Sequence, residues 1–131
     1  MKTKEDIEGY LIRLELPFEE VEDGLWVIHD DISHVDNIVV LYDPPIVVFR
    51  VKLMEVPTQR REEFFELLLR FNATHMIHGA YGIENGNVVI IDTLQAENLD
   101  FNEFQASVEA LSLAIAQDYD TLAAFRSPTT S

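Results

Sequence analysis

Four histidines are the side chains of this sequence best suited to bind a metal ion or to transfer a proton. His29 and His34 lie in a short stretch that also holds Asp30, Asp31 and Asp36. Imidazole and carboxylate groups together suit a hard or borderline cation. In a chain of 131 residues with 24 acids, however, such neighbours also arise by chance. We therefore interpret the stretch as a polar loop between strands. A metal sensor or metal-dependent hydrolase using the His29–His34 cluster is the alternative.

The other two histidines, His75 and His78, are three residues apart, a spacing that could allow both rings to bind one metal ion. No third ligand is evident nearby, and the His-Glu-x-x-His pattern of zinc proteases is absent. We interpret this segment as an ordinary loop after a helix.

The sequence contains no motif for nucleophilic catalysis. It has no cysteine, which excludes thiolate chemistry and disulfides, and none of its five serines lies in a Gly-x-Ser-x-Gly elbow. Gly79 and Gly82 do not belong to a phosphate-binding loop. Adjacent acids such as Glu62 and Glu63 diverge on a helix instead of meeting at one substrate. We therefore predict no catalytic residue, no metal, no cofactor and no enzymatic activity.

The charge of the chain limits its partners. The net charge is −15, which repels phosphate backbones and anionic lipid, so we predict no binding to nucleic acid or membrane. Five of the nine cations are close together in the sequence: Arg50, Lys52, Arg60, Arg61 and Arg70. They form either part of a solvated surface or a local patch for an acidic partner.

The hydrophobic pattern predicts one α+β domain over residues 1–126, with a disordered tail at 127–131. Helices are expected at 3–16, at 58–71 and, as the longest, from Phe101 onward. Strands are expected at 25–29, 38–42, 46–56, 79–84 and 87–94. Short connections between strands favour an antiparallel five-stranded sheet in the order α-β-β-β-α-β-β-α. Asp118 falls near the apolar stripe of the last helix, so we expect either a local end of burial or a polar partner there.

The absence of a signal region, of a membrane-spanning stretch and of cysteine predicts a cytoplasmic protein.

The number of apolar residues exceeds what one covered sheet face requires. Val39 and Leu41 oppose Ile38 and Val40 on their predicted strand, and the second helix has Phe65 and Leu69 outside its main stripe. Either all of these residues fill a monomer core, or a second chain covers the surplus; we favour the second explanation. The candidate interface residues are Phe65, Leu69, Arg61, Val48, Arg50 and Lys52.

Several segments resemble the YbjN-like proteins of bacteria, which are related in structure to the type III secretion (Tir-type) chaperones. These segments are Leu67–Asn72, His78–Ile83, Gly86–Ile91 and Glu97–Phe101. The resemblance follows the order of the elements over roughly residues 3–125, and it implies an α+β sheet with three helices and no cofactor. It also implies a non-enzymatic chaperone-like or regulatory role, often as a homodimer. The expected partners are therefore a second copy of the chain and a client or regulatory protein.

Overall fold

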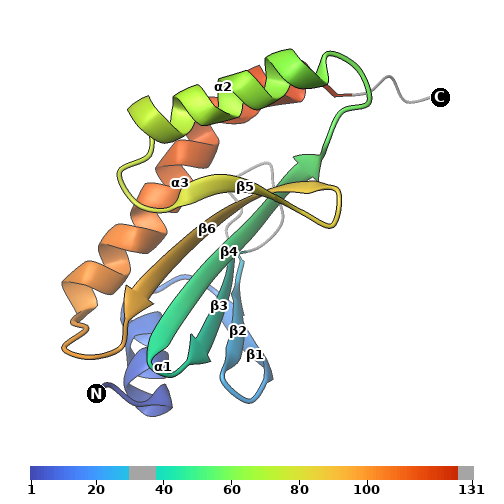
Figure 1. The fold of residues 1–131 in the computed structure, drawn as a ribbon. Coiled ribbons are helices and arrows are strands. Elements are labelled where there is room, and N and C mark those ends of the chain that lie inside the picture. Colours follow the sequence, from blue (N-terminus) through green and yellow to red (C-terminus); the bar gives the residue numbers. More distant parts are fainter. Residues whose placement is uncertain (30–37, 127–131) are drawn as a thin grey trace.

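The computed structural model describes residues 1–29 and 38–126, and in these residues three helices pack against one antiparallel sheet (Figure 1). Along the chain the elements are α1 (Lys4–Arg13), β1 (Phe18–Glu22), β2 (Leu25–Ile28), β3 (Ile38–Asp43), β4 (Ile46–Glu55), α2 (Arg61–Thr74), β5 (Ala80–Glu84), β6 (Asn87–Gln95) and α3 (Phe101–Ala123). The order across the sheet is β1-β2-β3-β4-β6-β5. The α+β class with three helices is confirmed. The predicted tail at 127–131 lies outside the described residues.

The prediction of five strands was wrong, because the described sheet has a sixth strand, β1. Its sequence is Phe-Glu-Glu-Val-Glu, and all but Phe18 are exposed. This strand is at the edge of the sheet and pairs only with β2, with a shift in register between Glu20 and Glu22. An edge strand with charged side chains shows no apolar alternation, so the sequence pattern did not reveal it.

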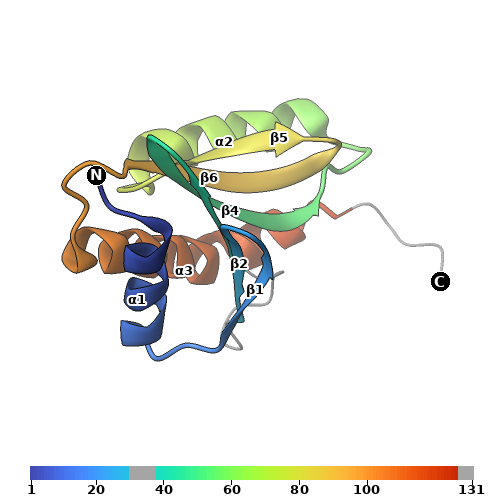
Figure 2. The same ribbon diagram turned by 90° about the horizontal axis from the view of Figure 1, so that it is seen from below.

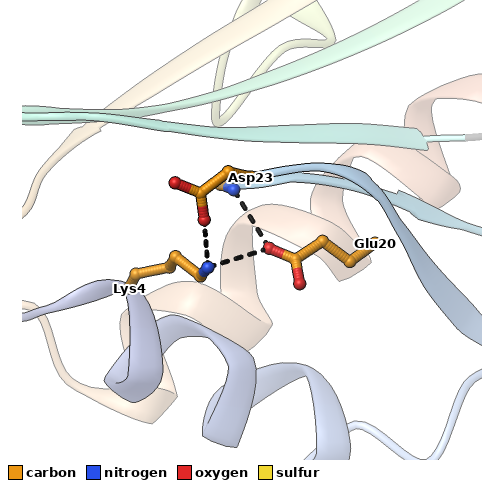
Figure 3. Close-up of polar contacts among 4 residues, drawn as sticks. Lys4, Glu20 and Asp23 are labelled. Carbon is orange, nitrogen blue, oxygen red and sulfur yellow. Dashed lines mark hydrogen bonds and ion pairs between the residues drawn. The ribbon is translucent and has the colours of Figure 1, made fainter.

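Polar contacts of Lys4 join the β1–β2 hairpin to the first turn of α1 (Figure 3). The Lys4 Nζ atom lies 3.2 Å from Glu20 Oε2 and also contacts the carboxylate of Asp23. The hydrogen bonds to Asp23 and Glu20 raise the pKa of Lys4 above its ordinary value. Glu20 Oε2 also accepts a hydrogen bond from the backbone N–H of Gly24, at 3.0 Å. The Glu20 carboxylate therefore contacts both the turn of the β1–β2 hairpin and the first turn of α1.

Local sequence signals set several element boundaries. Thr3 and Asp6 form a capping box at the start of α1, and the hydrogen bonds from Thr3 lower the pKa of Asp6. Asp100 caps α3 by accepting the N–H of Glu103, and α3 is the longest of the three helices at 23 residues. Asn85 and Gly86 have φ angles of 51° and 79° between β5 and β6, as a two-residue hairpin turn requires.

The second helix begins and ends three residues later than the predicted 58–71. Arg60 has a left-handed backbone, with φ at 57°, and its side chain caps no helix N–H group. The segment after Pro57 is therefore not yet helical, and the helix continues to Thr74. The first helix is shorter than the predicted 3–16, because the chain leaves helical geometry at Glu15, whose φ is 60°.

The helices cover one face of the sheet. Figure 2 shows α1 and α3 together on one side, and α2 lies beside the edge strand β5 (Figure 1). The covered face of β4 supplies Val47, Phe49, Val51 and Leu53 to the core. The Phe49 ring lies 5.2 Å from that of Phe104 on α3. The side chains between them on β4 point to the opposite side of the sheet, as the two-residue period of a strand requires.

The side chain of Asn72 joins α2 to the backbone of the edge strand β5. Its Oδ1 atom accepts the N–H of Tyr81 at 2.7 Å, and its Nδ2 atom donates to the carbonyl oxygen of Tyr81 at 3.3 Å. Tyr81 is paired with Ile90 of β6, and in an antiparallel pair the N–H and C=O of alternate residues point away from the neighbouring strand. Both backbone groups of Tyr81 bind Asn72 on that outer side. The asparagine amide thus takes the place of a neighbouring strand at this residue.

Asp118 of α3 is 1% exposed and has polar partners on two other elements, which resolves the expectation for this residue. Its Oδ2 atom accepts the Tyr81 hydroxyl at 2.7 Å, and its Oδ1 atom lies 2.8 Å from Nδ1 of His75, just after α2. Burial and the hydrogen bond to Asp118 raise the pKa of Tyr81. The His75 ring stacks on Phe71 at 4.4 Å. One carboxylate therefore connects α2, β5 and α3.

We predict that Asp118→Ala lowers the free energy of unfolding by about 2–4 kcal/mol, because Tyr81 and His75 both lose a buried acceptor. The matched control is Asp120→Ala, because Asp120 is exposed and lies two residues further along α3. This variant should change the free energy of unfolding by less than about 0.5 kcal/mol. Urea denaturation followed by circular dichroism measures both. Equal losses in the two variants would contradict a structural role for the Asp118 carboxylate.

Candidate protein-binding surface

The described residues do not support the metal-binding alternative. Residues 30–37, which include His34 and the three aspartates of the proposed cluster, lie outside the described residues. His29 is described: its Nε2 atom lies 3.6 Å from Glu19 on β1, and its side chain is 39% exposed. Across residues 1–29 and 38–126, no group of three or more His, Asp or Glu side chains is arranged to hold a metal ion.

One ring of the second histidine pair has a contact that joins two distant parts of the chain. The Nδ1 atom of His75 is engaged with the buried carboxylate of Asp118, so this ring helps to hold the C-terminal end of α2. The interpretation of this segment as an ordinary loop omitted that contact, which joins residues 43 positions apart.

In the described part of the chain, no helix has both the length and the apolar character needed to cross a bilayer.

The structure separates the six candidate interface residues into two groups of three. Arg61, Phe65 and Leu69 are on α2, four residues apart, and so lie along one side of that helix. Val48, Arg50 and Lys52 are on β4, and two strands, β6 and β5, separate β4 from the sheet edge where α2 packs.

The three residues on α2 differ in their exposure. Leu69 is 69% exposed, whereas Phe65 is half-buried and packs against the core. The Phe65 ring meets Phe64 edge-on, and the Arg61 guanidinium lies 5.2 Å from the centre of the Phe65 ring. The free apolar surface of this helix is therefore mainly that of Leu69, with Phe65 exposed in part.

The three residues on β4 belong to the uncovered side of the sheet, which we call the open face. Across the strands, Val27 pairs with Val39, Val39 with Arg50, and Arg50 with Ile91. A second row parallel to the first contains Leu25, Leu41, Val48 and Thr93. Side chains that are paired in this way lie on the same side of a sheet. The valines, leucines and isoleucine of the two rows are half-buried, so the open face is apolar and only partly shielded from water.

The open face contains a hollow of about 350 Å³ beside the β5–β6 hairpin. Its apolar wall consists of Val27, Val39 and Val89, and its charged wall of Arg50, Lys52 and Glu84. The Nη2 atom of Arg50 lies 3.5 Å from Glu84 Oε2, and both side chains are 42% exposed. A cationic pair thus borders an apolar depression in a molecule whose net charge is −15.

Several residues of the open face were not among the candidate residues. Val39 and Leu41 were recognised as surplus apolar residues, but Val27 and Glu84 were not connected with them. Strand periodicity assigns Val39 to the face opposite Val40, and it does not say which face the helices cover. The register from β2 to β6 is what brings Val27, Val39 and Arg50 into one row.

Comparison with known proteins agrees with this architecture. The family model CesT_Tir_1 matches residues 1–127 of the chain. No curated protein matches the sequence.

Similar solved structures include YbjN from E. coli, with 14% identity, a TM-score of 0.70 and coverage of 91% of this chain and 92% of that one. A chain of the ExsC–ExsE complex has 17% identity, a TM-score of 0.70 and full coverage of both chains. A chain of the ExoU–SpcU complex from the type III secretion system of Pseudomonas aeruginosa has 15% identity and a TM-score of 0.67, with coverage of 92% and 97%. The resemblance to YbjN-like proteins and secretion chaperones is confirmed at the level of the fold.

The two faces of β4 predict different costs for the same substitution. Val47→Ala should lower the free energy of unfolding by about 2 kcal/mol, because it removes two fully buried methyl groups. Val48→Ala, on the open face, should cost less than about 1 kcal/mol. Chemical denaturation of both variants tests this. A cost for Val48→Ala as large as that for Val47→Ala would mean that the open face is covered within the monomer.

Proposed function

This chain belongs to the CesT_Tir_1 family, and from that premise we propose that it is a non-enzymatic protein-binding module with a chaperone-like or regulatory role, which acts as a homodimer. The observation that supports binding most directly is the open face. Two rows of half-buried valines, leucines and one isoleucine lie side by side on this face, and apolar patches at a protein surface mark contact sites.

The structural neighbours support the same proposal. ExoU–SpcU is described as a heterodimeric complex of a type III secretion system, and HopA1–SchA as a chaperone–effector complex. SycH is described as a type III secretion chaperone in complex with a fragment of YscM2. One chain of each complex shares its fold with the present chain, so the fold is compatible with holding a segment of another protein.

The chemistry-bearing side chains of the described residues also favour a binding role. His75 and Tyr81 both contact the buried Asp118 and hold the ends of helices and strands together. His29 is next to Glu19, and among residues 1–29 and 38–126 this pair belongs to no group of three that could hold a metal ion. These contacts give each of the groups a structural role in the fold.

Homodimer formation is supported by the surface of α2 and the adjoining strand β5. Leu69 is 69% exposed and Ile83 on β5 is 52% exposed, and burying a leucine side chain fully contributes about 1.5–3 kcal/mol. Arg61 lies on the same side of α2 as Leu69 and supplies a cation in a chain of net charge −15. A contact that includes this cation reduces the repulsion between two anionic copies, and salt screens the rest beyond about 8 Å.

The binding proposal predicts that open-face variants lose their partners. The double variant Val39→Glu/Val48→Glu places two carboxylates on the apolar rows, and it should capture none of the proteins that the wild type retains from a lysate of the native organism. The control Leu113→Glu/Ile12→Glu adds the same charge at exposed sites on α3 and α1 and should retain them. Each captured protein is then purified and its dissociation constant measured by calorimetry. Equal retention by both double variants would contradict the assignment of the open face.

The homodimer proposal predicts a mass in solution of twice the 15.0 kDa of one chain. Leu69→Glu should reduce the mass to that of one chain, because a carboxylate replaces the exposed leucine of α2. Leu113→Glu, with the same charge change on α3, should leave the dimer intact. Size exclusion with light scattering measures all three. A wild-type mass of 15.0 kDa would contradict the homodimer and leave the binding proposal unaffected.

A further inference from the structure

The open-face hollow brings two cations to an apolar surface, and this combination restricts what the hollow can bind. Arg50 and Lys52 project from the same side of β4, on either side of the buried Val51. The half-buried Val27 and Val39 form the surface next to them, with the buried Val89 beneath. An aliphatic side chain can pack against the valines, while the positive charge of Arg50 and Lys52 beside it attracts an anionic group.

Arg50 retains hydrogen-bonding capacity in the described structure. Its side chain is 42% exposed, and its Nη2 atom is 3.5 Å from Glu84 Oε2, which is long for a charge-assisted hydrogen bond. A guanidinium has five donors and forms its strongest contact with a carboxylate that takes two of them in parallel. Glu84 therefore occupies the position of such a carboxylate only loosely.

We propose that this hollow recognises an aspartate or glutamate side chain in a segment of a partner protein, next to an aliphatic residue that packs on Val27, Val39 and Val89. Glu84 is the internal competitor that the partner's carboxylate displaces from Arg50. The inference rests on the proposed protein-binding function and names the chemistry of the partner segment. It also assigns Arg50 and Lys52 to selecting the partner.

The surroundings favour a single carboxylate on a polypeptide over a polyanion. A nucleic acid brings a phosphate every few ångströms and meets the repulsion of a chain with net charge −15. One carboxylate needs only the local field of the two cations, and the apolar wall contributes further through its contact with the aliphatic neighbour.

The test is selection of short random peptides, displayed on phage, against the immobilised full-length protein. We expect the selected peptides to share an acidic residue next to an aliphatic one. Arg50→Glu should weaken the binding of these peptides at least tenfold, and replacing their acidic residue by lysine should restore binding to that variant. Arg13→Glu is the matched control, because Arg13 undergoes the same charge change on α1, outside the hollow, and it should leave binding unchanged.

A second pair of variants separates competition by Glu84 from the overall charge. Glu84→Gln should tighten the binding of acidic peptides several-fold, because Arg50 loses its internal partner. Glu109→Gln, an equal charge change at an exposed site on α3, should not.

Several results would overturn the inference. If the selected peptides have no acidic preference and bind the wild type and Arg50→Glu equally, the inference is wrong and the proposed protein-binding function stands. If no peptide is selected at all, the result counts against the inference and against the proposed function. If DNA or RNA competes with the selected peptides, or if Arg50→Glu alters the oligomeric mass, the occupant is a nucleic acid or a second copy and the proposal is wrong.

Discussion

The buried carboxylate of Asp118 is the contact on which the arrangement of the C-terminal half depends. A carboxylate that is 1% exposed requires donors for both oxygen atoms, and these come from Tyr81 on β5 and His75 at the end of α2. The helix is therefore held beside the edge strand, where Asn72 also binds the backbone of Tyr81. With α2 held at the edge and with α1 and α3 on one face, no helix of the described residues covers the other face of the sheet.

This one-sided cover explains why the chain has more apolar residues than its core uses. The strands β2, β3 and β4 are apolar on both sides, and one side forms the core while the other forms the open face. The cations Arg50 and Lys52 interrupt this second surface at the hollow next to Glu84. The open face thus combines apolar area with a local charge opposite to that of the whole molecule, which is the chemistry of a selective contact surface.

Much of the fold could be predicted from local signals, because these act over three or four residues. The capping box at Thr3, the cap at Asp100 and the Asn85-Gly86 turn all appear where the sequence indicates them. Strand β1 was missed because its exposed glutamates lack an apolar period, and its contact with α1 is made by Lys4, which is 16 residues from Glu20. The set of residues that make up the open face could not be predicted from the sequence either. Periodicity divides each strand into two faces, but only the packing of α1 and α3 decides which face is covered.

The bond between Asn72 and Tyr81 has a further consequence for how the sheet ends. An unpaired edge strand is a template on which another chain can continue the sheet, and this is a route to fibrils. At β5 the Asn72 amide already occupies the two backbone groups of Tyr81. At the opposite edge, the exposed glutamates of β1 repel an identical strand that approaches in register. The molecule can therefore leave an apolar sheet face accessible to a partner while both ends of the sheet resist self-templated growth.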